Sequence, residues 1–248
     1  MISIVICTLN EELYLPKLLT TIKNQQGGVA YEVIVVDAGS KDKTREVAES
    51  FKSQGMPLRF LTPENTRNIA LQRNIGADNA IYDYIYFTDA DTLLPTDFLA
   101  KAYKELQERK ILVGGTKVYA SEKQFKYRMM YWNYSNLYVP FVRLFKPIVL
   151  GPSIFTTKEI HKKIGGFNYL MLFEDYNYGV DAAQFSRPQL LKTTAAQTSA
   201  RRFYSGSTRT ALELYWAGFY FLFNTKMTNR KMLQTYYKTT GNQPKPKY

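Results

Sequence analysis

Apolar and polar residues follow two alternating patterns through about the first ninety positions. Short runs rich in β-branched and aromatic residues predict four strands, over residues 2–7, 31–36, 58–61 and 82–88. Between these runs, apolar residues recur every three or four positions, which predicts helices that bury one face. Strands and helices therefore alternate, an order typical of an α/β fold whose parallel sheet carries helices on both sides.

Polar residues mark the starts of the predicted helices. We expect Asn10 to cap the first helix, and Asn65 or Thr66 to cap the third, which runs to about Ala80. The turn over residues 37–44 leads from the second strand into the second helix.

The second half of the chain shows the same signals less regularly. The pattern predicts a helix after Pro95, strands over 111–119 and 153–156, a short helix over 158–164, and a helix that follows Phe173. We divide the chain into a main unit over 1–205, with halves at 1–92 and 93–205 that the family resemblance described below would make the nucleotide-binding and acceptor halves, and a helical extension over 206–248.

Polar side chains follow three of the predicted strands at the point where each strand ends. Thr8 and Asn10 come after the first strand, and Asp37 ends the second. Asp89 and Asp91 end the fourth. The carboxyl ends of parallel strands meet at one sheet edge, where open α/β proteins bind ligands. Two carboxylates there suit Mg²⁺ or Mn²⁺ bound to a substrate phosphate, although a polar turn with an aspartate cap would produce the same pair.

The charge balance narrows the class of partner. A formal net charge of +12, from 33 lysines and arginines against 21 acidic residues, predicts attraction to nucleotides, nucleic acid or an anionic membrane surface. Neither a Gly-x-x-x-x-Gly-Lys-Ser/Thr loop nor a Gly-x-Gly-x-x-Gly turn follows the first strand, which argues against P-loop enzymes and dinucleotide-binding dehydrogenases. His161 is the single histidine, so multi-histidine metal sites are excluded, and we expect it on the surface of a helix.

Cysteine usage and hydropathy indicate the compartment. Cys7 is the single cysteine and lies in an apolar run, which predicts a buried residue in a reducing, cytoplasmic environment. We expect neither a signal peptide nor a membrane-spanning helix. The apolar segment 211–223, followed by basic residues, suits a helix at a membrane interface, a helix packed on the sheet, or a dimer contact. The polar tail from 234 is expected to be mobile.

Five short motifs occur along the chain in order. They are residues 4–11, residues 35–44, Asp89-Ala90-Asp91, Gly165-Gly166-Phe167 and Glu174-Asp175. Each is weak alone, but together, over residues 2–202, they resemble the family 2 glycosyltransferases of the GT-A fold. The resemblance implies a mostly parallel, Rossmann-like sheet, a nucleotide-sugar donor, a divalent metal (Mn²⁺ or Mg²⁺) and inversion at the anomeric carbon.

The resemblance also implies roles for single residues on the donor side. The nucleoside pocket would be lined by Thr8, Asn10, Glu11 and Asp37. The base, ribose or diphosphate would be approached by Arg67, Arg73 and Asn74. Asp89, Ala90 and Asp91 match the Asp-x-Asp motif, in which Asp91, more than Asp89, would ligate the metal directly.

On the acceptor side, the resemblance assigns a general base. Asp175, next to Glu174, lies at the family's position for that base, and the loop 165–167 would border the donor sugar and the acceptor. Arg201 and Arg202 resemble a basic element that contacts the diphosphate; the alternative is a solvated charge pair. Without the family, an acidic pair at a helix N-terminus is commonly structural.

Two departures from the family pattern limit what the resemblance implies. Many members have a second aspartate where this chain has Ala38, so UDP, GDP and dTDP all remain open as the donor nucleotide. The Gln-x-x-Arg-Trp motif of processive members is absent, since residues 201–203 match it only in part. The chain is therefore expected to transfer a single sugar.

The expected chemistry needs these residue types. A direct displacement requires a base for the proton of the acceptor hydroxyl, and an aspartate is ionised at neutral pH. Glu174 would raise the pKa of Asp175 by repulsion between like charges. If the acceptor is a lipid phosphate, which is already ionised, Asp175 would orient or bind it instead.

Two other functions remain open from the sequence. A nucleotidyltransferase would usually carry a glycine-rich, basic loop after the first strand, where this chain has the acidic run 8–11. A non-enzymatic basic module for nucleic acid or membrane would need no carboxylates at strand ends. We favour a glycosyltransferase whose acceptor is a sugar or a lipid-linked group such as polyprenyl phosphate. It would be cytoplasmic and peripheral on the cytoplasmic membrane face, with a homodimer left open and no nucleic-acid partner expected.

Overall fold

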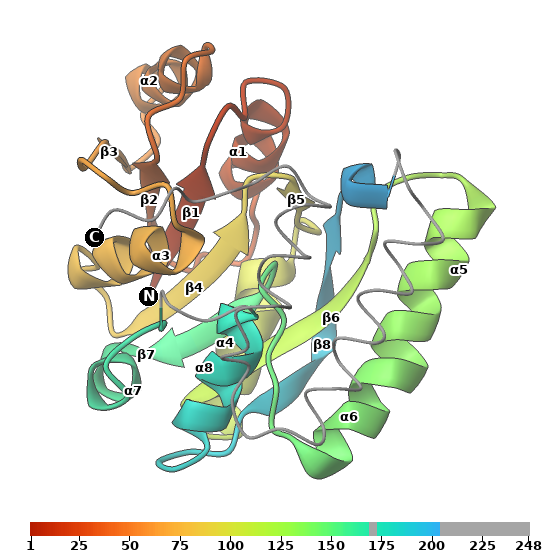
Figure 1. The fold of residues 1–248 in the computed structure, drawn as a ribbon. Coiled ribbons are helices and arrows are strands. Elements are labelled where there is room, and N and C mark those ends of the chain that lie inside the picture. The colour runs from red at the N-terminus through yellow and green to blue at the C-terminus, as the bar shows by residue number, and fades with distance from the viewer. Residues whose placement is uncertain (169–172, 204–248) are drawn as a thin grey trace.

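Eight strands form a single sheet in the computed structural model, which describes residues 1–168 and 173–203 (Figure 1). Across the sheet the order is β3-β2-β1-β4-β7-β6-β8-β5. The strands are β1 (Ile2–Thr8), β2 (Tyr31–Asp37), β3 (Leu58–Leu61), β4 (Tyr84–Asp89), β5 (Thr92–Leu93), β6 (Val113–Ala120), β7 (Ile154–Thr157) and β8 (Gln189–Thr198).

Helices connect these strands and cover both faces of the sheet (Figure 1). They are α1 (Leu15–Lys23), α2 (Thr44–Ser53), α3 (Ile69–Asp78), α4 (Phe98–Glu108), α5 (Phe125–Asn133), the π-helical turn η1 (Tyr134–Tyr138), α6 (Val139–Phe145), α7 (Lys158–Lys163), α8 (Glu174–Ala182) and the 3₁₀ turn η2 (Arg201–Phe203). The α/β architecture expected from the sequence is confirmed.

The first four strands pair in parallel, as their alternation with helices predicts. Strand β1 lies between β2 and β4, so that Thr8 is paired with Asp37 and Cys7 with Asp89. The β1 side chains alternate between two cores. Ile4 and Ile6 belong to a cluster with α1, α2 and α4, whereas Val5 belongs to a cluster with α3, α7 and α8.

The second half of the sheet contains antiparallel pairs. Strand β7 runs antiparallel to both β4 and β6, and β5 pairs antiparallel with β8. The sequence pattern predicted neither β5 nor β8. Strand β8 is rich in threonine, alanine and glutamine, and the backbone N–H groups of Lys192 and Thr193 donate to the Glu105 carboxylate of α4 at 2.9 to 3.0 Å.

Three local expectations were wrong. Asn10 does not cap α1; its backbone is left-handed (φ 58°) and its Oδ1 accepts a hydrogen bond from Lys41 N at 2.9 Å. Helix α3 is capped by Asn68, not by Asn65 or Thr66. His161 is buried rather than on the surface, because its side of α7 packs on the aromatic core, where Nδ1 lies 3.0 Å from Tyr178 Oη.

Helices α5 and α6, joined by η1, form one helical rod at the outer edge of the sheet, beside β6 and β8 (Figure 1). Among the described residues, no helix is both long and apolar enough to cross a bilayer. The predictions for the extension 206–248, including the apolar segment 211–223 and the mobile tail, lie outside the described residues.

The contact between α3 and β1 leaves no room for a side chain at Gly76, where a methyl group would lie 2.2 Å from Val5 Cγ1. We expect Gly76→Ala to destabilise the fold by about 1 kcal/mol or more, because overpacking outweighs a gain of about 1 kcal/mol in helix propensity. Urea unfolding measures the change. Adding Val5→Ala should relieve the clash, so the two substitutions together should cost less than their sum. A stabilised Gly76→Ala variant would contradict this packing.

Candidate active site

The carboxyl ends of β1, β2 and β4 bring Thr8, Asp37 and Asp89 to one edge of the sheet. Thr8 Oγ1 donates to Asp37 Oδ1 at 2.9 Å, and Asp37 Oδ2 accepts from the backbone N–H groups of Gly39 and Ser40 at 3.0 and 2.8 Å. Asp37 therefore fixes the turn that follows β2, while it lies at the edge where the sequence placed the nucleoside pocket.

The loops after β1 and β2 are held together by side chains that bond to backbone. Asn10 N donates to Ser40 Oγ and Glu11 N donates to Thr44 Oγ1, both at 2.8 Å. Gln72, which was not among the residues predicted from the sequence, donates its buried Nε2 to the carbonyls of Thr8 and Val36 at 2.9 and 2.8 Å. A polar residue on the inner face of a predicted helix is the signal that could have revealed it.

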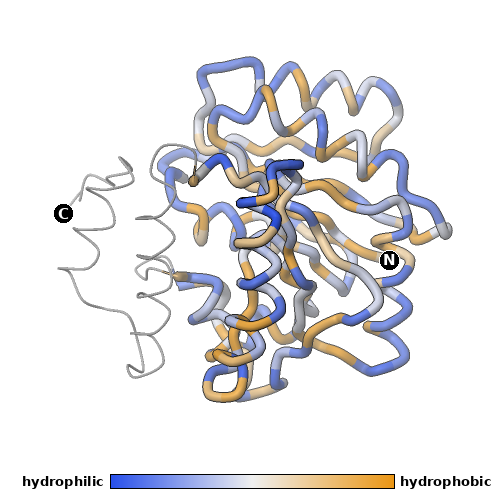
Figure 2. The backbone as a smooth tube through the Cα atoms, turned by 90° about the vertical axis from the view of Figure 1, so that its right-hand side faces the viewer, coloured by the Kyte–Doolittle hydropathy of each residue, from blue (hydrophilic) through white to orange (hydrophobic). Residues whose placement is uncertain are grey.

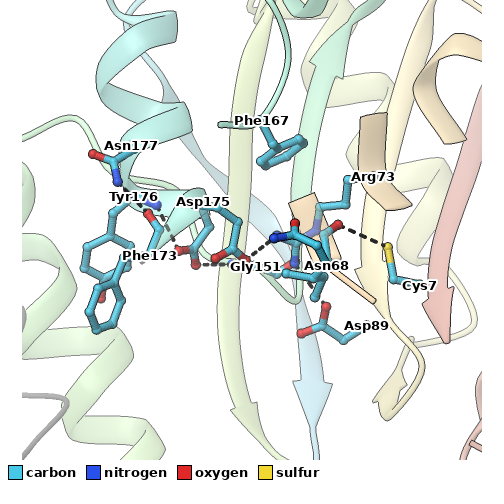
Figure 3. A network of polar contacts seen from close by, with 12 residues as sticks. Cys7, Asn68, Arg73, Asp89, Gly151, Phe167, Phe173, Asp175, Tyr176 and Asn177 are labelled. Carbon is cyan, nitrogen blue, oxygen red and sulfur yellow. Dashed lines mark hydrogen bonds and ion pairs between the residues drawn. The ribbon is translucent and has the colours of Figure 1, made fainter. Parts of the chain in front are cut away.

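Arg73 is a buried cation at the centre of the site (Figure 3). Its side chain is 1% exposed, and Nη1 lies 2.8 Å from Glu174 Oε1 while Nη2 lies 3.1 Å from Asp89 Oδ1. Nη2 also donates to Gly151 O at 3.3 Å, and the guanidinium lies over the Phe167 ring. Burial opposes the charge, but the two carboxylates raise the pKa of Arg73 above its ordinary value. Arg73 thus joins the two acidic motifs to each other.

Asp175 and Arg73 both contact Gly151 (Figure 3). Gly151 N donates to Asp175 Oδ2 at 2.7 Å, and Tyr176 N donates to Oδ1 at 2.9 Å. Burial, and next the charge of Glu174, raise the pKa of Asp175 to about 7. Only the second of these causes was expected from the sequence. Asp175 is therefore a carboxylate poised to exchange a proton near neutral pH.

The residue that precedes α8 has an unusual backbone. Phe173 adopts the left-handed conformation (φ 55°), which costs a non-glycine residue about 1–3 kcal/mol and is concentrated at functional sites. The conformation places Glu174 and Asp175 in the first turn of α8. Strain at this point is consistent with a functional role for the acidic pair.

Asn74 binds protein backbone in this structure. Its Nδ2 donates to Phe167 O at 2.9 Å and its Oδ1 accepts from Phe167 N at 2.7 Å. A methyl group at Gly166 (φ 77°) would lie 2.6 Å from Asn74 Oδ1, so glycine is required there. Phe167 is buried and stacks on Tyr178 with ring centroids 4.0 Å apart. Asn74 therefore positions the loop that the resemblance places beside the sugars.

Arg201 forms a second cationic centre, between the loop after β1 and the Asp-x-Asp motif. Its Nη1 and Nη2 bind both Glu11 oxygens at 2.8 and 2.6 Å, and its Nε lies 2.8 Å from Asp91 Oδ2. Thr198 Oγ1 donates to Asp91 Oδ1 at 3.1 Å. Burial, and next the charge of Asp89, raise the pKa of Asp91 to about 6. Arg201 is thus bound to carboxylates and is not a solvated charge.

The remaining predicted residues are placed as follows. Arg67 is exposed and lies in the loop before α3, not on the helix as the sequence suggested. Ala90 is buried between the two aspartates of its motif. Arg202 lies in η2, and its side chain is outside what the structure describes.

Asp89 and Asp91 provide the hard oxygen donors that Mg²⁺ and Mn²⁺ prefer. In residues 1–168 and 173–203, no group of three or more His, Cys, Asp or Glu side chains forms a ready-made metal cage. These two metals usually bind through one or two carboxylates together with substrate phosphates, and the two aspartates fit the protein's part of such a site.

Sequence comparison finds relatives that match part of the chain. A segment of 111 residues, 45% of this chain, is 35% identical to an uncharacterized glycosyltransferase, YfnE, of Bacillus subtilis. The match spans 28% of that relative's length.

Two solved structures share the fold. S. aureus TarS 1–349 in complex with UDP-GlcNAc superposes with a TM-score of 0.66 at 18% identity, over 88% of this chain and 66% of that one. The mannosyltransferase PcManGT from Pyrobaculum calidifontis, in complex with GDP-Man and Mn²⁺, has a TM-score of 0.66 at 20% identity, over 99% and 65% of the two chains. The architecture is therefore the GT-A fold.

The family model described as glycosyl transferase family 2 matches residues 3–166. This range contains the ends of β1, β2 and β4, Arg73 and the start of the loop 165–167. The match extends over more than half of the sequence, and the chain belongs to glycosyl transferase family 2.

Proposed function

We propose that the chain transfers a single sugar from a nucleotide-diphosphate sugar to an acceptor, with inversion and with the help of a divalent metal. The observation that carries the proposal is the connection through Arg73, which bonds to Asp89 of the Asp-x-Asp motif and to Glu174, next to Asp175. The motif at which the diphosphate would leave and the base that would act on the acceptor are thereby held in one rigid arrangement. The family match favours this function over a nucleotidyltransferase or a basic module.

The donor is proposed to be a UDP-, GDP- or dTDP-sugar bound at the ends of β1 and β2. The two structural neighbours hold different donors, UDP-GlcNAc and GDP-Man, so the shared fold does not identify the nucleotide of this chain's donor. Thr8, Asp37 and the loop of Asn10 and Glu11 are the proposed nucleoside pocket. When bound by Asp91 and Asp89, Mn²⁺ or Mg²⁺ would supply positive charge to the departing diphosphate.

Asp175 is proposed as the general base. Its carboxylate would take the proton of the acceptor hydroxyl while the acceptor oxygen forms a bond to the anomeric carbon. The bond from that carbon to the diphosphate oxygen breaks, and the diphosphate leaves with the electron pair. A direct displacement of this kind inverts the anomeric centre. With a lipid phosphate as acceptor, no proton has to be removed, and Asp175 would bind or orient the phosphate.

Arg201 is proposed to change partners when the donor binds. In this structure it neutralises Glu11 and Asp91. A diphosphate carries more negative charge than the Glu11 carboxylate that Arg201 binds through both oxygens here, so it would compete for the guanidinium, and release of Asp91 would make that carboxylate free for the metal.

Donor binding is tested by thermal unfolding with UDP-, GDP- and dTDP-sugars, with and without Mn²⁺. One nucleotide class should raise the melting temperature, because a ligand at 100 times its Kd adds about 2.7 kcal/mol of stability. Asp91→Asn should remove the part of the shift that depends on Mn²⁺. Asp97→Asn is a matched control. Among the described ion pairs, Asp97 takes part only in an exposed one with Lys101 of α4. A wild-type protein that no donor stabilises would contradict the proposal.

The role of Asp175 predicts a pH profile. Because the base must be ionised, kcat/KM should fall as the pH drops below about 7, the raised pKa of Asp175. Glu174→Gln should move this limb to lower pH, since it removes a neighbouring negative charge. Asp175→Asn should lower kcat by about 10²- to 10⁴-fold without loss of donor affinity. A profile that is flat between pH 5 and 8 would exclude Asp175 as the base for a hydroxyl acceptor.

Arg201→Gln should have opposite effects on two ligands. The affinity for Mn²⁺ alone should rise, because a competing cation leaves Asp91, while the affinity for the nucleoside diphosphate should fall by about tenfold or more. Titration calorimetry of Mn²⁺ and of the diphosphate measures both. Arg187→Gln, at an exposed arginine on another surface, is the control. If both affinities fell together, Arg201 would be a structural residue of the pocket and not a partner of the diphosphate.

A further inference from the structure

The outer face of the helical rod (residues 125–145) is strongly apolar. Half of the fourteen large hydrophobic side chains that the described residues expose lie on it. Beyond Phe125, this outer face consists of Met129, Trp132, Leu137, Phe141, Leu144 and Phe145. The rod lies along the right-hand edge of Figure 1, and that side faces the viewer in Figure 2, where hydrophobic colour recurs along it. Exposed apolar surface concentrated on one element marks an interaction site.

The inner face of the rod already accounts for its packing on the sheet. Tyr127, Ser135, Val139 and Val142 are buried. Ser135 Oγ both donates to Val118 O and accepts from Val118 N, which fixes the rod on β6. The outer residues are therefore not needed to hold the rod in place, and their hydrophobicity indicates contact with something outside the described fold.

The charge along the rod and the segment that follows it has a single sign. From residue 123 to residue 157 the sequence contains no aspartate or glutamate, whereas it contains Lys123, Lys126, Arg128, Arg143 and Lys146. At the end of α6, a shallow depression is lined by Arg143 together with Arg109, Arg187 and Lys192. Aromatic and aliphatic side chains between basic residues are the composition of a helix that lies in an anionic membrane interface.

We propose that the outer face of the rod docks on an anionic lipid surface. A second copy of this chain is a poorer occupant, because a two-fold interface would bring the same basic residues together. The extension 204–248 has an apolar segment at 211–223, but it carries seven lysines and arginines against one glutamate, so its charge does not complement the basic residues of the rod. Anionic phospholipid headgroups complement the charge, and the acyl region accepts the apolar side chains.

Docking here would present the acceptor side of the site to the membrane. From the inner side of the rod, Tyr134 Oη lies 2.6 Å from Tyr176 Oη, and Tyr176 is the neighbour of Asp175. A lipid-linked acceptor that lies in the bilayer under the rod would therefore have its headgroup near α8. This consequence for the acceptor rests on the proposed function, whereas the docking surface itself does not.

Vesicle binding by the full chain tests the proposal. Wild type should co-sediment with phosphatidylcholine vesicles that contain phosphatidylglycerol, and only weakly with pure phosphatidylcholine. Phe141→Glu should weaken the partition into vesicles by about tenfold or more. The substitution removes an aromatic side chain that would be buried in the bilayer and adds a negative charge that the anionic headgroups repel. Ile81→Glu is the matched control, because Ile81 is 62% exposed against 51% for Phe141 and lies before β4, away from the rod.

A second pair of measurements separates lipid docking from dimer formation and from loss of the donor site. Lys126→Glu with Arg128→Glu should also weaken binding to the anionic vesicles. Melting temperatures and the donor-induced shift should be unchanged in each variant, so that failure of donor binding and failure of docking are distinguished. The proposal is overturned if Phe141→Glu binds vesicles like wild type. It is equally overturned if wild type ignores anionic vesicles and sediments as a dimer that Phe141→Glu dissociates.

Discussion

A buried arginine that must be neutralised is the constraint on which the site depends. Arg73 has almost no contact with solvent, so its charge has to be met by protein oxygens. Those oxygens come from the end of β4, from the loop at Gly151 and from the first turn of α8. Breaking a buried ion pair by removing one partner typically costs about 3–5 kcal/mol, so these three segments are held in register by electrostatics as well as by packing.

The same constraint sets the acidity of the site. One guanidinium faces Asp89 and Glu174 directly, with Asp175 beside them, so the cluster carries more negative than positive charge when all are ionised. Burial first, and next the charge of Glu174, raise the pKa of Asp175, which therefore holds its proton more tightly than an exposed aspartate would. Arg201 plays a parallel part for Glu11 and Asp91. In the described residues both acidic motifs are therefore paired with cations, and the proposed binding of a donor would be an exchange of ion pairs.

The sequence predicted those features that follow from local periodicity. Strands β1 to β4 have clear apolar runs, and parallel pairing forces their polar ends to one edge, so Thr8, Asp37 and Asp89 were placed correctly. Periodicity does not say what a polar side chain faces. Arg73 and Asn74 were expected to approach the donor, yet in this structure they bind Glu174 and Phe167, about a hundred residues away in the chain.

The strands that the sequence pattern did not predict lack the local signal on which such a prediction depends. The pairing of β8 with β6 shifts register, and there the backbone N–H groups of Lys192 and Thr193 donate to Glu105 instead, so β8 shows no regular apolar alternation.

The pairing of Arg201 with Glu11 spans 190 positions of the chain. As the protein is synthesised, β1 to β4 can assemble through short crossovers, because each pairs with a neighbour already made. The loop after β1 then carries an acidic residue whose counter-ion has not yet been translated. The sheet can thus form early, but Glu11 is neutralised only when the last described turn folds back onto the first loop. The order of synthesis therefore favours assembly of the sheet before the ion pairs at its edge are complete.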